Sequence, residues 1–193
     1  MRSCTRQPST WVRRPSTASY AVSGGAFRFD TQDAQLVNDE NTASVLTEPA
    51  PSGDFVVETK MALDLPATGS AFSGAQAGIA LYGGDDRYVK LVHAAVGDTR
   101  QTAFAQELPS APKGWPRYGS TPVGPPDETT WLRIVKHASF VSAYTSRDGV
   151  HWVRGATYQY SALGSNPRIG LVSMGLAGFT ARFDYVRVRS LAS

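Results

Sequence analysis

Hydrophobic and polar residues alternate with a period of two along many short segments of this chain. In Phe55–Leu63 the odd-numbered positions are mostly apolar, whereas Glu58 and Lys60 occupy positions between them. The run Phe179–Tyr185 repeats the pattern, so its odd-numbered residues are expected on one face and its even-numbered residues on the other. A period of two is typical of β-strands that bury one face.

Helical periodicity is not sustained over any window of eleven or more residues. Residues 31–43 come closest to a helical period, but their polar centre Asn38-Asp39-Glu40-Asn41 indicates a loop. Glycine (18) and proline (12) separate runs rich in β-branched and aromatic residues, which predicts an all-β domain, a sandwich or a barrel. The predicted strands are Ala26–Asp30, Ala43–Thr47, Phe55–Leu63, Gln76–Tyr82, Tyr88–Ala95, Thr99–Gln106, Trp131–Lys136, Phe140–Ser146, Trp152–Ala156, Arg168–Ser173 and Phe179–Arg187.

Four large aromatic residues in these runs are expected in the core: Trp131, Trp152, Phe183 and Tyr185. The chain is predicted to form one domain over residues 11–193, preceded by a basic, polar tail over residues 1–10.

The dipeptide Gly97-Asp98 predicts a two-residue hairpin turn between two strands. This register pairs Val96 with Thr99 and His93 with Thr102. It also predicts one shared face formed by Val89, Leu91, His93, Arg100, Thr102, Phe104 and Gln106.

The stretch Leu108–Pro126 contains six prolines and three glycines, which argues against a strand. It is also long for a simple connection. Because it carries Trp115 and Tyr118 together with two cations, we expect a packed functional loop.

The charge of the chain is uneven. The net charge is +3, but Arg2, Arg6, Arg13 and Arg14 precede the first acidic residue, and without these four the chain has 15 basic and 16 acidic residues. We therefore expect a solvated basic tail, no basic cluster in the body and no nucleic-acid partner. No apolar run reaches the roughly 20 residues that span a bilayer, so no membrane partner is expected. Residues 1–10 also lack the apolar stretch of a secretory leader.

Catalytic chemistry has little support in the sequence. The motifs of serine hydrolases, zinc proteases and nucleotide-binding loops are absent, and the single Cys4 offers neither an internal disulfide nor a zinc site. Glycosidases need two carboxylates about 5 to 10 Å apart. Glu58 stands alone in its strand and Asp85-Asp86 lies in a turn, so no catalytic residue is assigned and enzyme activity of this chain alone is not expected.

An ordered series of short motifs nevertheless resembles a known family. The series includes Ser23-Gly-Gly-Ala-Phe-Arg-Phe29, Arg87-Tyr-Val-Lys-Leu91, Ser146-Arg-Asp-Gly149 and Phe183-Asp-Tyr185. It resembles the concanavalin A-like domain at the C-terminus of family 43 glycoside hydrolases, the β-xylosidases and arabinan-degrading relatives, over about Trp11 to Val188. The resemblance implies a two-sheet antiparallel jelly-roll sandwich, usually attached to a five-bladed propeller that carries the catalytic carboxylates, and an extracellular location.

The sequence departs from that family in two places. Met1–Thr10 replaces an additional strand, from which we expect either a module separated from a longer secreted enzyme or a late start of the reading frame. His93–Glu107 and the proline-rich stretch are longer and more polar than in the β-xylosidase type.

The candidate carbohydrate-binding residues are Trp115 and Tyr118 in the proline-rich stretch, with His93, Arg100, Gln101 and Glu107 on or near the hairpin beside it. Aromatic faces stack on sugar C–H surfaces, and planar polar groups bond the hydroxyls. Three plainer interpretations stay open: the aromatic residues pack the loop, His93 is a core histidine, and Arg100 forms a surface ion pair with Asp98 or Glu107. Tyr82 with Asp85-Asp86 is a further candidate rim, or a solvated turn.

Cofactors are not expected. Asp184 is the one calcium candidate, because lectin-like sandwiches often hold calcium near a chain end, but one carboxylate is far from the roughly six to eight oxygen ligands required.

These observations predict a non-catalytic carbohydrate-binding or ancillary module of a polysaccharide-degrading glycoside hydrolase. The expected partners are a polysaccharide or oligosaccharide containing arabinose or xylose, and a glycoside hydrolase catalytic domain. Two alternatives remain: a lectin-fold glycosidase with its own carboxylate pair, and a protein-interaction β-sandwich.

Overall fold

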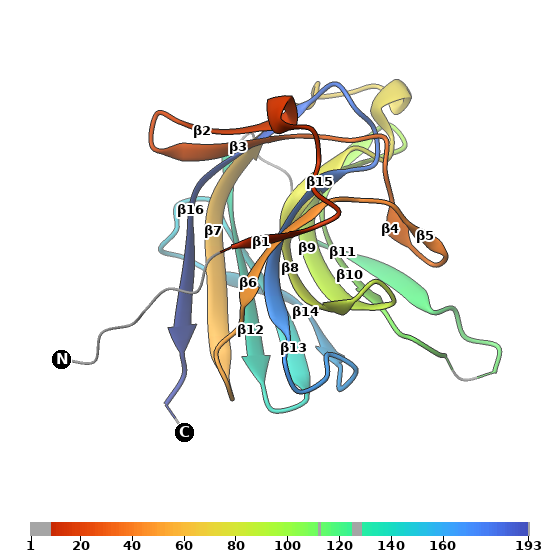
Figure 1. The fold of residues 1–193 in the computed structure, drawn as a ribbon, viewed down its shortest axis with the longest axis vertical. Helices are drawn as coiled ribbons and strands as arrows, with labels where there is room; N and C mark the ends of the chain where they lie inside the picture. Colours follow the sequence, from red (N-terminus) through yellow and green to blue (C-terminus); the bar gives the residue numbers. More distant parts are fainter. Residues whose placement is uncertain (1–8, 112, 125–128, 193) are drawn as a thin grey trace.

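Two antiparallel seven-stranded sheets face each other in the computed structural model, which describes residues 9–111, 113–124 and 129–192 (Figure 1). The front sheet consists, in spatial order, of β1 (Thr10–Val12), β6 (Val45–Pro49), β15 (Arg168–Met174), β8 (Gln76–Gly84), β9 (Arg87–Val96), β10 (Thr99–Glu107) and β11 (Tyr118–Gly124). The back sheet consists of β14 (Val153–Gln159), β13 (Phe140–Ser146), β12 (Thr129–His137), β7 (Phe55–Leu63), β16 (Thr180–Ser190), β3 (Ala26–Asp30) and β2 (Tyr20–Ser23).

Short elements complete the described chain. A two-stranded hairpin is formed by β4 (Leu36–Val37) and β5 (Glu40–Asn41), and two 3₁₀ turns are η1 (Thr17–Ser19) and η2 (Ser70–Phe72). The fold is therefore the predicted two-sheet sandwich, and all eleven predicted strands are present with ends that differ by a few residues. None of its helices could cross a membrane, as far as the described residues show.

The β9–β10 hairpin has the predicted register. Val96 pairs with Thr99 and His93 with Thr102. Gly97 occupies the left-handed region with φ +56°, as the turn requires.

The main core lies between the sheets and combines apolar residues of both inner faces, among them Phe29, Phe55, Met61, Phe104 and Phe183. A second apolar cluster lies on the outer face of the front sheet. There, Leu36 of the β4–β5 hairpin is fully buried against Tyr88, Val92 and Val172. The segment 31–43 thus acts as a cover over this face, and we call it the cover segment.

The proline-rich stretch was wrongly expected to lack strands. Its second half forms β11, which pairs only with β10 and lies at the edge of the front sheet. Pro122 is tolerated there because an edge strand leaves one row of backbone groups unpaired, and a bulge interrupts the ladder between Thr102 and Ala103.

A second correction concerns the aromatic residues expected in the core. Phe183 is buried there, but Trp131, Trp152 and Tyr185 are only partly buried. The pairing of β16 with β7 shifts between Phe183 and Tyr185, so Asp184 occupies a bulge and Tyr185 lies on the outer face. Trp131 is paired directly with Lys60 and also faces outward.

Basic side chains are a third correction. Arg13 belongs to the folded structure, because it donates to the Ala43 carbonyl and lies 2.9 Å from Asp85. The body also contains a basic cluster, contrary to expectation, on the outer face of the back sheet. Arg2, Arg6 and Cys4 lie outside the described residues.

Candidate functional site

A shallow groove of about 200 Å³ lies on the outer face of the front sheet, beside the cover segment. It is built from strands β8 to β11, whose alternate residues point away from the core. Small side chains, including Ala94 and Ala103, form much of its lining, and Gln76, Tyr118 and Ser120 add polar groups. Strand alternation therefore produces a surface with space above it and several hydrogen-bonding groups around it.

Glu107 is fully buried at the end of β10, next to this groove. Its Oε2 accepts hydrogen bonds from the backbone amide of Asn38 and from the Tyr88 hydroxyl, both at 2.9 Å. Its Oε1 lies 3.1 Å from Arg117 Nη2. Both carboxylate oxygens are thus engaged, and the bond from Asn38 ties the cover segment to the front sheet.

Lys90 is buried beside Glu107 on the same face. Its Nζ lies 3.3 Å from the Leu36 carbonyl oxygen, and 5.5 Å and 5.3 Å from the rings of Tyr88 and Tyr118. Burial lowers the pKa of Lys90 to about 7, although the negative charge of Glu107 opposes the shift. Burial likewise raises the pKa of Tyr118.

Arg117 joins the proline-rich loop to the cover segment. Its Nη2 lies 3.3 Å from Asp39 and 3.4 Å from Asp86, in addition to its contact with Glu107. The hydrogen bond that Arg117 donates to Glu107, reinforced by the charges of the other two carboxylates, raises the pKa of the guanidinium further. The loop base is closed by the Leu108 amide, which donates to the Arg117 carbonyl.

Trp115 lies in the loop between β10 and β11, which projects away from the sandwich (Figure 1). Its side chain is 73 % exposed, whereas the other three tryptophans are partly buried. The indole is therefore available for contact with a ligand.

The six predicted binding residues are distributed over three places. Tyr118, Glu107 and the partly buried Gln101 share the outer face of the front sheet, because they alternate with the inward residues of β10 and its partners. Trp115 lies on the loop beyond this face. His93 and Arg100 point to the opposite side, since each is one residue out of phase with the outward positions.

The two inward residues, His93 and Arg100, are in contact with other parts of the protein. His93 is 4 % exposed at the inner side of β9. Arg100 donates to the carbonyls of Pro66 and Gly69 at 2.6 and 3.2 Å, and so fastens the loop before η2. These partners are backbone carbonyls, whereas the alternative interpretation of Arg100 was an ion pair with Asp98 or Glu107.

Tyr82 and the two following aspartates form a packed turn. The Tyr82 hydroxyl lies 2.5 Å from Asp85, and burial together with this bond raises the pKa of Tyr82 to about 12. Asp86 accepts from Asn41 and contacts Arg117. These side chains anchor the turn between β8 and β9 to Arg13 and to Asn41 of the cover segment.

No carboxylate pair of the glycosidase type is formed by the two buried glutamates. Glu107 lies on the outer face of the front sheet and Glu58 on the outer face of the back sheet, so the whole sandwich separates them. Glu58 is itself held by Arg133 at 2.6 Å and by the Tyr185 hydroxyl at 2.9 Å.

The turn Ser146–Trp152 contains polar contacts that the sequence analysis did not anticipate. His151 Nδ1 lies 2.6 Å from Asp148 Oδ2, and Ser146 Oγ donates to Asp148 Oδ1 at 3.0 Å. The bond from His151 lowers the pKa of Asp148 and raises that of His151. The aspartate lies between the serine and the histidine, so the Ser146 hydroxyl bonds to Asp148 and not to the imidazole that activates the nucleophile in a serine–histidine pair.

Asp184, the calcium candidate, contacts two cations, Lys60 at 3.2 Å and Arg182 at 2.9 Å. Within the described part of the chain, no three acidic, histidine or cysteine side chains gather in a way that could hold a metal ion.

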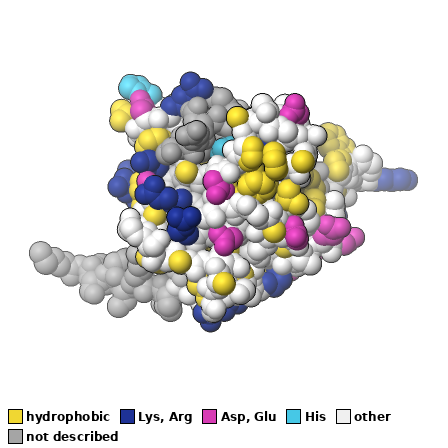
Figure 2. Space-filling view, turned by 90° about the horizontal axis from the view of Figure 1, so that it is seen from above, with side chains coloured by type: hydrophobic (Ala, Val, Ile, Leu, Met, Phe, Trp, Pro, Cys, Tyr) yellow, Lys and Arg dark blue, Asp and Glu magenta, His cyan; other side chains and the backbone are white. Residues whose placement is uncertain are grey.

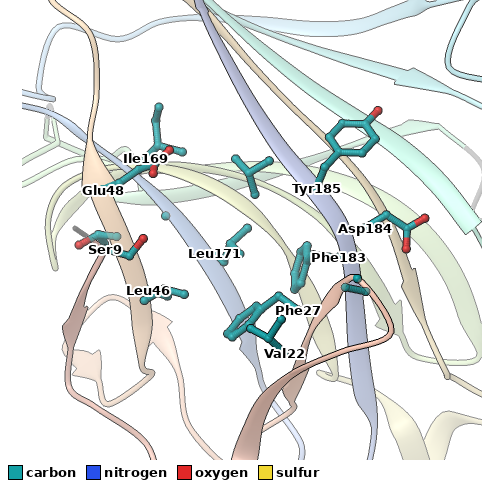
Figure 3. Close-up of a pocket in the computed structure, with 15 residues that line it drawn as sticks. Ser9, Val22, Phe27, Leu46, Glu48, Ile169, Leu171, Phe183, Asp184 and Tyr185 are labelled. Atoms are coloured by element: carbon teal, nitrogen blue, oxygen red, sulfur yellow. The ribbon is translucent and has the colours of Figure 1, made fainter. Parts of the chain in front are cut away.

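A second hollow, of about 560 Å³, opens at the side of the sandwich between the two sheets (Figure 3). Leu46, Ile169 and Leu171 come from the front sheet, and Phe27 and Phe183 from the back sheet. Glu48 lies on one side and Asp184 and Tyr185 on the other. Because its walls come from strands far apart in the sequence, no local motif predicts it.

Solved structures that resemble this chain identify its fold. No family model and no curated protein matches the chain. A functionally unknown protein from Saccharomyces cerevisiae has a similar structure, with a TM-score of 0.77, 12 % identity, and coverage of 96 % of this chain and 97 % of that one.

Glycoside hydrolases are also among the similar structures. The GH43 BlXynB protein from Bacillus licheniformis matches with a TM-score of 0.73, 19 % identity, and coverage of 94 % of this chain but 36 % of that one. A xylan beta-1,4-xylosidase from Bacillus halodurans matches with a TM-score of 0.72, 20 % identity, and coverage of 93 % and 36 %. The chain has the concanavalin A-like fold of the β-sandwich domain of these proteins, as the sequence resemblance predicted, and spans about a third of their length.

Proposed function

We propose that this chain is a non-catalytic ancillary module of polysaccharide degradation that binds a neutral polysaccharide outside the cell. The observation that carries the proposal is the indole of Trp115, which is 73 % exposed on the loop that leads into β11, the strand whose Tyr118 and Ser120 line the groove of the front sheet. A large exposed aromatic side chain on an ordered loop is typical of a contact site.

The groove offers a second contact for the same ligand. Gln76 and Ser120 provide hydrogen-bond donors and acceptors, and Tyr118 provides a ring edge or hydroxyl. A sugar chain that stacks on Trp115 could continue into this groove. The similarity to GH43 structures, including a xylan β-xylosidase, supports xylose- or arabinose-containing polysaccharides as the ligand class.

The proposal excludes hydrolysis by this chain itself. Glu107 is the buried carboxylate nearest the groove, and hydrogen bonds from Asn38, Tyr88 and Arg117 occupy both of its oxygens. A general acid or nucleophile needs access to the glycosidic bond, which this carboxylate lacks.

Affinity electrophoresis in gels containing arabinoxylan, arabinan or no polysaccharide tests the proposal. We expect arabinoxylan or arabinan to retard the wild-type protein, and Trp115→Ala to weaken the affinity by about tenfold, as the loss of one stacking contact predicts. Trp115→Phe should keep part of the affinity. Phe140→Ala, which removes an exposed aromatic residue from the other sheet, should bind like wild type. A wild-type protein that neither polysaccharide retards contradicts the proposal.

Packing against a catalytic domain is a second candidate function. The side hollow in Figure 3 favours it, because Val22 is 80 % exposed and the partly buried Leu46 lies beside the opening between the sheets. Sedimentation of this chain mixed with a separately expressed GH43 catalytic domain tests it. A complex that Val22→Asp abolishes and Trp115→Ala leaves intact supports docking, and the absence of any complex contradicts it.

A further inference from the structure

The outer face of the back sheet carries a concentration of positive charge. Over strands β14, β13, β12, β7 and β16, the outward positions hold six cations and two carboxylates, Glu58 and Asp184. The cations, which define what we call the arginine face, are Lys60, Arg133, Arg154, Arg182, Arg187 and Arg189. Dark blue side chains gather on the left flank in Figure 2, the side on which β16 and β7 lie in Figure 1.

This concentration is unexpected for the body of the chain, whose net charge after residue 14 is −1. It arises because the bulge at Asp184 brings Arg187 and Arg189 onto the same face as Arg133 and Lys60. The bulge in β16 therefore places positive charges on one face, although the net charge of this part of the chain is close to zero.

Three of the arginines form one straight row across the sheet. Arg154 pairs with Tyr144, Tyr144 with Arg133, Arg133 with Glu58, and Glu58 with Arg187. An arginine thus occurs at every second strand. Since neighbouring strands are about 4.8 Å apart, successive arginines of the row start about 9.5 Å from one another.

Aromatic rings hold these cations in place. The Arg133 guanidinium lies 3.5 Å from the centre of the Trp152 ring, and that of Arg187 lies 4.0 Å from the Tyr185 ring. Glu58 accepts from Arg133 and Tyr185, which fixes the middle of the row. Such preorganisation reduces the entropy lost when a ligand binds.

We infer that the arginine face binds an acidic polysaccharide, specifically a β-1,4-linked polyuronate in an extended ribbon. Carboxylates on one side of such a ribbon recur at every second sugar, a spacing close to that of the arginine row. The exposed Arg154 and Arg187 at the two ends of the row can bind carboxylates through two parallel hydrogen bonds, while Arg133, whose Nε and Nη2 donate to Glu58, contributes its charge. Tyr144, between Arg154 and Arg133, offers a ring for the intervening sugar.

The arginine face is a sheet surface along which an extended ribbon can lie. A nucleic acid is also a polyanion that Lys and Arg can bind, so duplex DNA is the competing ligand from which the test must separate the polyuronate. The site lies on the opposite sheet from the Trp115 groove and does not depend on the proposed function.

The experiment is calorimetric titration of the full chain with polymannuronate, with carboxyl-reduced polymannuronate as the uncharged control. The row variant Arg154→Ala/Arg187→Ala removes two arginines of the row. The matched variant Arg182→Ala/Arg189→Ala removes the same charge outside the row. All four side chains are exposed, and thermal unfolding checks that both variants fold.

We expect polymannuronate binding that the reduced polymer lacks, an affinity loss of about tenfold in the row variant, and at most about threefold in the matched variant. Trp115→Ala should bind polymannuronate like wild type, which separates this site from the groove. Equal losses in the two double variants, no binding by wild type, or equally tight binding of duplex DNA would each overturn the inference.

Discussion

Strand alternation directs side chains outward on both faces of the sandwich, but these side chains are covered on one face and exposed on the other. On the front sheet the cover segment buries Tyr88, Lys90 and Glu107 beneath Leu36. On the back sheet nothing comparable lies over the described strands, and arginines and aromatic rings remain at the surface. A β-sandwich can therefore present a second core on one side and a contact surface on the other, depending on whether one loop folds over it.

On each outer face a buried carboxylate binds an arginine, but the other groups that donate hydrogen bonds to the two carboxylates differ. Glu107 binds a backbone amide of the cover segment together with Arg117. Glu58 binds only side chains, Arg133 and Tyr185. Burial raises the pKa of Glu58, but the bonds from Arg133 and Tyr185 outweigh it, so the pKa is lowered.

Removing the centre of the cover should produce the largest effect. Leu36→Ala deletes a fully buried side chain and leaves a cavity against Tyr88 and Val172, so we expect the free energy of unfolding to fall by about 2 to 5 kcal/mol. Urea unfolding followed by tryptophan fluorescence measures it. Phe140→Ala, on the uncovered face, should change stability by about 0.5 kcal/mol or less. Equal losses in the two variants would show that the faces do not differ in this way.

The buried charge of the covered face should give a stability that depends on pH. The pKa of Lys90 is about 7 in the folded protein against an ordinary value of 10.5, so between pH 7 and 10 the unfolded chain holds a proton that the folded protein has lost. The free energy of unfolding therefore rises with pH in this window, by on the order of 1 kcal/mol per pH unit.

Lys90→Met isolates this contribution. The difference in unfolding free energy between wild type and variant should change steadily from pH 7 to 10 in urea titrations. Parallel curves for the two proteins would mean that Lys90 keeps an ordinary pKa under the cover. Arg133→Met, a change of the same kind on the uncovered face, should leave the pH profile in this window unchanged.

The smallest effect is expected from an aromatic residue of the uncovered face. Trp152→Ala removes the ring beneath Arg133 and should lower the unfolding free energy by about 1 kcal/mol. Urea unfolding followed by circular dichroism measures it, and Trp115→Ala should be close to neutral because that side chain is largely exposed. A loss of several kcal/mol would indicate that Trp152 belongs to the core, as its sequence context first indicated.

Strand existence could be predicted from the sequence because each strand carries its own alternation, and the Gly97-Asp98 turn fixed the β9–β10 register. Tyr185 was assigned to the wrong face because a bulge changes the phase of a strand without changing its composition. β11 was missed because Pro122 and its glycines argue against a strand wherever the strand is not at an edge.

The candidate site was only partly predictable for the same reason. The proline-rich stretch indicated the exposed Trp115, and Tyr118 lies beside the groove. The cover segment was read as a loop, so nothing in the sequence indicated that Glu107 would be enclosed by Asn38. The arginine row depends on pairing between four neighbouring strand pairs, which no local pattern contains.

The place of β16 in the back sheet has a consequence for biosynthesis. This strand lies between β7 and β3, so two strands made earlier in translation have no neighbour on that side until β16 has been synthesised. The meanders β8–β11 and β12–β14 need only sequence-local contacts and can form first. A nascent chain that still lacks β16 exposes the edges of β7 and β3 to other chains, so aggregation and folding compete until β16 has been synthesised and has paired.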